Sequence, residues 1–293
     1  NRMSSPSAPS SPVGVGRPPE RGKLGYPFGM AERIEQLDDP RIAAFRHVRD
    51  RELIRRRSLF IAEGEHLVRR LLESGWAVES VLVTPAKLDV FEPIADTRAP
   101  LYVADEPLVQ QIVGYRFHRG VIAAGRRPTF PSVSDVIGDL PGRATLLVCP
   151  EINDAENLGS LIRIAGAFGV DAMILGERCS DPLYRRTVRV SMGAVFSVPI
   201  AISEDLLADL DVLGEADVEL IATVTDDDAE PLSGAARRDR LALLVGSEGE
   251  GLHRRFAGVC DRRVTIPMSA GADSLNVAVA TAVFLHHFQH NVR

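Results

Sequence analysis

The sequence predicts an α/β protein of two domains, in which a larger parallel-sheet domain follows a smaller α/β domain. Short apolar runs alternate with segments of helical periodicity over residues 31–127, and again from residue 144 onward. Such alternation is typical of sheets covered by helices, and continuous apolar strands favour a parallel sheet. The length of 293 residues fits two domains, at roughly 100–200 residues each.

The first part of the chain divides into a tail, a small domain and a linker. Residues 1–30 are rich in serine, proline and glycine without periodicity, so we expect a disordered tail. Within residues 31–127 we predict helices over 41–55 and 65–74, a further helix ending near 113, and strands over 58–64, 78–84, 100–105 and 120–125. Three prolines mark residues 128–143 as a linker with room for one short helix.

Residues 144–293 are predicted to form one parallel sheet with helices on both faces. Strands are predicted at 145–149, 172–176, 196–200, 219–224, 241–246 and 263–267. Helices are predicted at 157–168, 204–213 and 274–289. Ligands of such folds bind beyond the carboxyl ends of the strands, so the glycine-rich loop 246–251 and the loop after Pro267 are candidate sites.

Composition argues against several classes of protein. The sequence has no run of 18 or more apolar residues and no N-terminal secretory signal, so we expect no membrane span. Three widely spaced cysteines argue against a disulfide framework or a zinc site and favour the cytoplasm. The net charge is −6, yet nine arginines and four acidic residues lie between Arg41 and Arg70. That segment is a candidate phosphate-binding face, with a solvated helix surface as the equally weighted alternative.

One candidate motif lies on the helix predicted at 157–168. Its apolar residues recur at helical spacing and define a buried face: Leu158, Leu161, Ile162, Ala165 and Phe168. Arg163 lies nearly opposite the centre of that face, so it is predicted to point away from the core. By geometry alone a solvated arginine is the favoured reading. Asn157 is expected to cap or begin the helix.

Two further motifs follow in the last fifty residues. The sequence GSEGEG at 246–251 suits a tight turn close to a ligand, but it lacks the features of a dinucleotide fingerprint and of a phosphate loop. After Pro267, Asp273 or Ser274 is expected to cap the C-terminal helix. The histidines near the end of that helix are expected to complement its dipole, with no metal site.

In this order the motifs resemble one family. Asn157 with Arg163, then Gly246-Ser-Glu248-Gly-x-Gly, then Ile266-Pro-Met with Ser274-Leu-Asn276-Val, are similar to the SpoU (TrmH) branch of the SPOUT RNA methyltransferases. Residues 189–200 resemble the family's stretch between its first two motifs. Residues 31–127 resemble, in layout only, the L30e-like substrate-binding domain that many members carry. Ser247 departs from the asparagine that many members have there.

The resemblance implies a fold, a cofactor and a reaction. The fold would carry a trefoil knot, and the protein would be a homodimer joined through its C-terminal helix. S-adenosylmethionine would be held largely by backbone groups, at Thr223, Gly246, Ile266, Met268 and Leu275. Arg163 would activate a ribose 2′-hydroxyl, positioned with the help of Asn157, Glu248, Ser274 and Asn276.

We therefore expect an enzyme that methylates RNA ribose without a metal ion, with ribosomal RNA as the preferred substrate and transfer RNA as the close alternative. A non-catalytic RNA-binding protein on the same fold is a second hypothesis, which the joint presence of Arg163, Glu248, Ser274 and Asn276 disfavours. A nucleotide-dependent oxidoreductase is disfavoured by the missing fingerprint.

Overall fold

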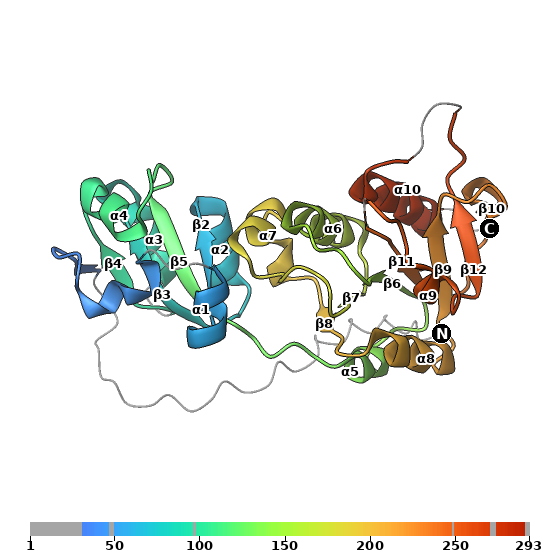
Figure 1. The fold of residues 1–293 in the computed structure, drawn as a ribbon. Coiled ribbons are helices and arrows are strands. Elements are labelled where there is room, and N and C mark those ends of the chain that lie inside the picture. The colour runs from blue at the N-terminus through green and yellow to red at the C-terminus, as the bar shows by residue number, and fades with distance from the viewer. Residues whose placement is uncertain (1–30, 47–49, 96–97, 248, 270–273, 291–293) are drawn as a thin grey trace, which may run out of the picture.

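The computed structural model describes residues 31–46, 50–95, 98–247, 249–269 and 274–290. The tail expected at 1–30 and two residues singled out by the sequence, Glu248 and Asp273, lie outside the described residues. None of the described helices is long and apolar enough to cross a membrane. Figure 1 shows the two parts side by side, with the N-terminal strands at one end and the larger sheet at the other.

The N-terminal domain is a five-stranded mixed sheet in the order β1-β4-β3-β5-β2. Its strands are β1 (Glu32–Arg33), β2 (Leu59–Glu63), β3 (Val78–Val83), β4 (Leu101–Val103) and β5 (Val121–Arg126). Its helices are η1 (Pro40–Phe45), α1 (Asp50–Arg57), α2 (Glu65–Glu73), η2 (Pro85–Lys87), α3 (Leu88–Ala95) and α4 (Glu106–Val113). The helix predicted over 41–55 was wrong in extent, because η1 ends at Phe45 and α1 begins only at Asp50.

The C-terminal domain is a seven-stranded, all-parallel sheet in the order β10-β12-β9-β11-β6-β7-β8. Its strands are β6 (Ala144–Cys149), β7 (Ala172–Leu175), β8 (Ile200–Ile202), β9 (Glu219–Val224), β10 (Glu230–Pro231), β11 (Arg240–Leu244) and β12 (Arg262–Thr265). The strand order reverses direction between β6 and β11, the kind of switch point where parallel sheets form ligand crevices. The predicted fold class is confirmed, whereas the threading of the C-terminus into a knot stays a prediction.

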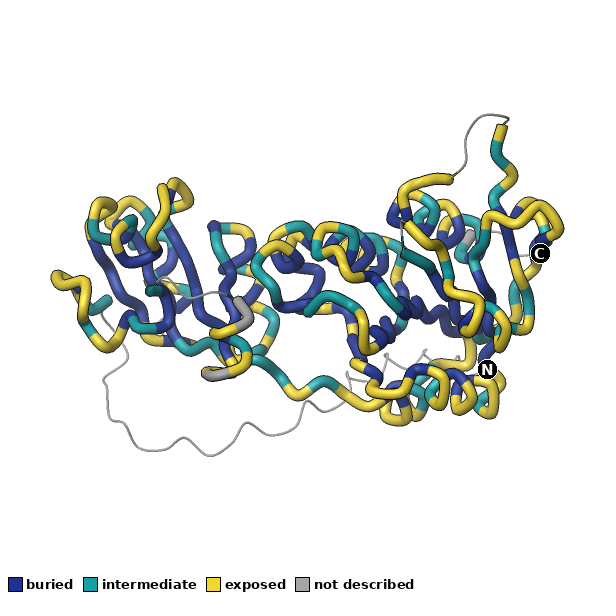
Figure 2. The backbone as a smooth tube through the Cα atoms, viewed as in Figure 1, coloured by how far each residue is buried: buried dark blue, intermediate teal, exposed yellow. Residues whose placement is uncertain are grey.

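Helices cover both faces of this sheet, as Figure 1 shows. Its helices are α5 (Val133–Gly138), α6 (Ala155–Phe168), α7 (Arg185–Val190), η3 (Ala194–Phe196), α8 (Leu206–Glu215), η4 (Leu232–Gly234), α9 (Arg254–Ala257) and α10 (Val277–His290). Side chains of α6, α7 and α10 share one buried cluster with the sheet, and those of α5, α8 and α9 share another. Figure 2 shows the strands as a buried layer between half-exposed helices.

Three predicted boundaries in this domain were wrong for local reasons. The strand expected at 196–200 begins only at Ile200, because residues 194–196 form the turn η3. The C-terminal helix begins at Val277 rather than Ser274, since the Asn276 side-chain oxygen accepts from the amides of Ala278 (2.9 Å) and Val279 (3.3 Å). Asp154, rather than Asn157, caps α6.

The two domains are docked on one another through buried apolar and charged contacts. Phe60, Trp76 and Phe196 form an aromatic trio with ring centroids 5.5–5.8 Å apart. Arg127 donates to both carboxylate oxygens of Asp181 at 2.8 and 2.9 Å. One apolar cluster includes residues of both domains, so the junction resembles a core more than a loose contact.

The end of α10 is fixed over the amino ends of the strands. Arg237 donates to the Ala144 carbonyl (3.0 Å), at the start of β6, and to the Phe288 carbonyl (3.2 Å), in the last turn of α10. His287 Nε2 lies 2.8 Å from the Ala235 carbonyl. Because the helix ends at the amino edge of the sheet, its beginning lies at the carboxyl edge, where the candidate loops are.

Candidate active site

The loop 246–251 follows β11 and closes on itself. The backbone groups of Ser247 and Gly251 exchange two hydrogen bonds of 3.0 Å, and Gly251 has a positive φ of 67°. The backbone at Leu252 passes so close to Gly246 that a side chain there would overlap it. Glycine at position 246 is therefore required by a close approach of two backbone segments, which the sequence pattern had indicated only as a tight turn.

Beside this loop lies a cavity of about 770 Å³ at the carboxyl ends of β9, β11 and β12. It is lined by Ser274 and by all five residues that the sequence assigned to the cofactor: Thr223, Gly246, Ile266, Met268 and Leu275. Thr223 Oγ1 donates to the Leu244 carbonyl at 2.9 Å, which joins the ends of β9 and β11 at the cavity. The structure thus brings together six residues that lie as much as 52 positions apart in the sequence.

The cavity wall is partly apolar and partly charged. Apolar groups come from Val224, Leu252 and Phe284, and charged groups from Asp226, Glu250, Arg254 and Arg263. Sequence reasoning missed the charged residues, although Asp226 lies only two positions after the end of β9. Arg263 donates to Asp226 (2.9 Å) and Asp228 (2.8 Å), and it holds the pKa of the Asp228 carboxyl below its usual range. These contacts fix charges at the rim without a bound ligand.

A second, more polar cavity of about 370 Å³ adjoins the first and shares Ser247, Gly249, Glu250 and Val277 with it. Asn157 lines this second cavity from the first turn of α6. Because Asp154 Oδ1 accepts from the amides of Glu156 (2.8 Å) and Asn157 (2.9 Å), the Asn157 side chain is not needed as a cap. Its Oδ1 instead accepts from Asn276 Nδ2 at 3.3 Å, which joins the starts of α6 and α10.

Glu151 lies in the wall of the second cavity and is largely buried. Its Oε1 accepts from Arg178 Nη1 at 3.1 Å and from Arg255 Nη2 at 2.9 Å. Beneath it, the Ile152 amide lies 3.3 Å from Cys179 Sγ, and burial raises the pKa of that thiol to about 12. Cys179 is therefore a neutral structural thiol here and not a nucleophile.

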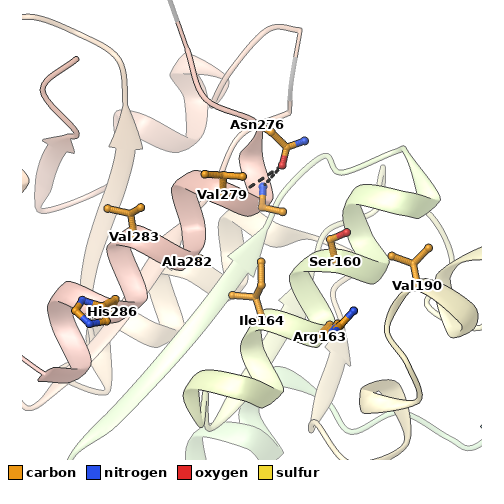
Figure 3. Close-up of a pocket in the computed structure, with 10 residues that line it drawn as sticks. Ser160, Arg163, Ile164, Val190, Asn276, Val279, Ala282, Val283 and His286 are labelled. Carbon is orange, nitrogen blue, oxygen red and sulfur yellow. Dashed lines mark hydrogen bonds between the residues drawn. The ribbon is translucent and has the colours of Figure 1, made fainter. Parts of the chain in front are cut away.

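Arg163 lies elsewhere, on the outer face of α6. It is exposed, as its helical position predicted, and it lines an open groove of about 690 Å³ between α6 and α10 together with Ser160 and Asn276 (Figure 3). Among the described residues no carboxylate forms an ion pair with it. Arg163 does not line the larger cavity. Asn276 connects the two regions, since it faces the groove and bonds to Asn157.

The residues predicted to be catalytic thus lie in three different places: the large cavity, the polar cavity and the groove. Ser274 lies in the large cavity, Asn157 in the polar cavity, and Arg163 with Asn276 in the groove, while Glu248 lies outside the described residues. Within the described residues no group of three His, Cys, Asp or Glu side chains is arranged to hold a metal ion.

Comparison with known proteins supplies a family for this arrangement. The model of the SpoU rRNA methylase family matches residues 144–286, and that of the MRM3-like substrate binding domain matches residues 39–122. An uncharacterized tRNA/rRNA methyltransferase of Mycobacterium bovis is 41% identical over 267 residues, which cover 88% of this chain and 92% of the relative.

Two further relatives extend the comparison to a named activity and to a solved structure. The 23S rRNA (guanosine(2553)-2′-O)-methyltransferase RlmP of Bacillus subtilis is 27% identical, over 88% of this chain and 99% of the relative. The S-adenosylmethionine-bound rRNA methyltransferase of Sinorhizobium meliloti has the same fold, with a TM-score of 0.74 at 24% identity, over 88% of this chain and 97% of that chain.

Proposed function

The chain belongs to the SpoU rRNA methylase family, and from this we propose that it transfers a methyl group from S-adenosylmethionine to a ribose 2′-hydroxyl of ribosomal RNA. The observation that carries the proposal is the cavity of about 770 Å³ that collects all five cofactor residues expected from the sequence. Transfer RNA stays the alternative substrate, since the Mycobacterium bovis relative is named for both RNAs.

The large cavity fits S-adenosylmethionine in size and chemistry. Its volume falls within the roughly 300–1,000 Å³ of small-molecule sites. Gly246 lets the loop close beside the cavity, because a Cβ at this position would overlap the backbone of Gly251 and Leu252. Apolar Ile266, Leu275 and Phe284 suit a flat aromatic base, while exposed charges at the rim suit an amino-acid group. When bound, the cofactor supplies a methyl group attached to a sulfonium. The thioether that remains after transfer is a good leaving group, so the transfer needs no metal ion.

The chain's own residues must solve the difficulty of the nucleophile. A ribose hydroxyl is a very weak acid, so its developing negative charge needs stabilisation in the transition state. A guanidinium is a cation that suits charge stabilisation rather than proton abstraction. Among the described residues no carboxylate forms an ion pair with Arg163, so its charge is available to the substrate. Asn157 and Asn276, joined by their hydrogen bond, would hold the ribose between the groove and the cofactor cavity.

Because Arg163 does not line the cofactor cavity of its own chain, we place it in the site of a second copy. The α6–α10 groove carries exposed apolar residues at its centre, with Val279 52% and Val283 40% exposed. Apolar exposure of this kind on a C-terminal helix suits a self-complementary interface. A homodimer through α10 would cover these valines and bring Arg163 toward the partner's cofactor.

Mixed dimers test this arrangement. Arg163→Ala and Gly246→Val chains, each inactive alone, are combined by denaturation and refolding. If Arg163 acts across the interface, half of the dimers are mixed and each has one intact site, so about a quarter of the wild-type activity returns. If Arg163 acts within its own chain, the mixture stays inactive, and the two-copy site is refuted.

The reaction itself is tested by mass spectrometry of nucleosides. The protein is incubated with labelled S-adenosylmethionine in two separate reactions, one with ribosomal RNA and one with transfer RNA, both from cells that lack the gene. Label in a 2′-O-methyl nucleoside of ribosomal RNA supports the proposal, and label only in transfer RNA selects the alternative. No label with intact cofactor binding, on free RNA and on ribosomal particles, would establish a non-catalytic binding protein. A ribosomal RNA substrate also favours a cytoplasmic protein, in accord with three free cysteines.

A further inference from the structure

Four of the nine arginines in segment 41–70 are engaged with the protein itself. Arg41 pairs with Asp39 and Glu32, and the side-chain bonds to Asp39 and Glu32 raise the pKa of its guanidinium. Arg46 donates to a backbone carbonyl, and Arg69 pairs with Glu65 at 3.5 Å. Arg70 donates to the Met192 carbonyl at 2.8 Å and so belongs to the domain junction. Part of the basic charge that the sequence suggested for RNA is therefore held by neighbouring groups, whereas Arg55 and Arg57 are exposed.

A second set of arginines lies where the two domains meet. In the loop between α4 and β5, Arg116 and Arg119 are exposed, and Arg119 pairs with Glu63 at 3.5 Å. On α7, Arg185 and Arg189 are one helical turn apart, so they share a face. Arg189 and Arg116 are exposed and, among the described residues, have no ion pair.

The loop and α7 face each other across the junction. Tyr115 donates to Glu63 at 2.7 Å, and burial together with this hydrogen bond raises the pKa of its phenol. Arg119 and Tyr115 thus meet at the Glu63 carboxylate, and Arg185 begins α7. α7 also packs directly against β2, the strand that ends at Glu63. The basic groups of the two domains therefore adjoin.

Contacts between α7 and α6 connect this basic surface to Arg163. Gly159 on α6 lies so close to α7 that an added side chain would meet Val190. Val190 and Arg163 line the same groove (Figure 3). At the other end of α7, Arg186 pairs with Glu156 in the first turn of α6, next to Asn157. The α7 helix thus bridges the N-terminal domain and the residues assigned to ribose.

We propose that Arg116, Arg119, Arg185 and Arg189 form a phosphate-binding strip across the domain junction, which guides an RNA backbone from the N-terminal domain to Arg163. The proposal rests on the proposed function. The strip is local positive charge on a protein whose net charge is −6, and anionic RNA is the partner that such a strip selects. Docking of the domains is needed for it, because half of its arginines come from each side.

Salt dependence of RNA binding tests the strip against the arginine-rich segment. Arg116→Gln and Arg189→Gln each remove one charge from the strip. Arg55→Gln is the matched control, since Arg55 is also exposed but lies in segment 41–70. Binding of fluorescent ribosomal RNA fragments is measured by anisotropy over a range of KCl concentrations. We expect the slope of log Kd against log salt to fall by about 0.7–0.9 for each strip variant, and to stay unchanged for the control.

Three companion measurements make the result decisive. Melting temperatures and S-adenosylmethionine affinity should match the wild type in every variant, which excludes unfolding. In methylation assays the strip variants should raise the KM for RNA more than they lower kcat, because they act on binding. An unchanged slope in both strip variants, or an equal fall in Arg55→Gln, would overturn the strip. A failure of the proposed function can be told apart from a failure of the strip. It would appear as absent methylation by the wild-type protein, whatever the slopes of log Kd against log salt.

Discussion

Replacing Gly246 with alanine tests whether the loop 246–251 holds the cofactor. A methyl group on Gly246 would lie 2.0 Å from the Leu252 nitrogen and 2.1 Å from the Gly251 carbonyl carbon, far inside ordinary contact. Both neighbours are backbone atoms, so no side chain can turn away, and the loop must open. Overpacking of this kind costs about 1–3 kcal/mol. If the open loop must close again to bind S-adenosylmethionine, the Kd rises roughly 5- to 150-fold.

Gly249→Ala is the matched control, because it lies in the same loop and an added Cβ meets nothing within 4 Å. Titration calorimetry of S-adenosylmethionine should show near wild-type affinity for Gly249→Ala and the stated loss for Gly246→Ala. Melting temperatures separate loss of binding from loss of the fold. Wild-type affinity in Gly246→Ala, or equal losses in both variants, would refute the close approach at position 246 as a binding determinant.

Three other predictions follow from the structure. Arg163→Ala should lower turnover about 10²–10³-fold. Its affinity for S-adenosylmethionine should stay near normal, because Arg163 does not line the large cavity. Arg163→Lys should recover part of the lost turnover, and equal turnover in the wild type and both variants would remove Arg163 from the mechanism. Arg262→Gln removes the guanidinium that pairs with Glu219 at 3.1 Å and leaves Arg238, at 3.7 Å, beside this carboxylate. The loss of one hydrogen bond to a buried charged group should cost about 1.5–3 kcal/mol in urea unfolding, and an unchanged free energy of unfolding would contradict this. Burial raises the pKa of Cys179 to about 12, so the neutral thiol dominates at pH 8, and native iodoacetamide labelling should be far slower than labelling in urea.

The meeting of the proposed cofactor residues at one cavity was predictable in part, because two of the loops that carry them follow strand ends. Gly246 and Ile266 follow β11 and β12, and parallel strands bring such positions to one edge. The exposure of Arg163 was predictable as well, since it follows from the helical period of the buried residues around it. The meeting of the two loops and the exposure of Arg163 follow from local periodicity and the geometry of a parallel sheet, whereas the assignment of individual residues to the cofactor came from the resemblance to the SpoU family.

The features that could not be predicted depend on contacts between distant residues. The aromatic trio joins Phe60 to Phe196, and nothing in either segment indicates the other. The engagement of Arg41 and Arg70 by neighbouring groups is invisible to a count of charges. The start of α10 was misplaced because several polar residues precede it, and only the packing of the helix selects Asn276 as its cap.

Asn276 caps a helix and also has a proposed role in positioning the ribose, and two substitutions separate these roles. Its Oδ1 caps α10, and its Nδ2 donates to Asn157. Asn276→Asp keeps the acceptor, and its charge suits the helix N-terminus, so stability should be maintained while the bond to Asn157 is lost. Asn276→Ala loses both and should cost about 1 kcal/mol of stability as well. If positioning by the bond to Asn157 matters, both variants should lose turnover to a similar degree, although only Asn276→Ala has a lowered melting temperature. Full activity in Asn276→Asp would show that Asn276 serves the helix alone.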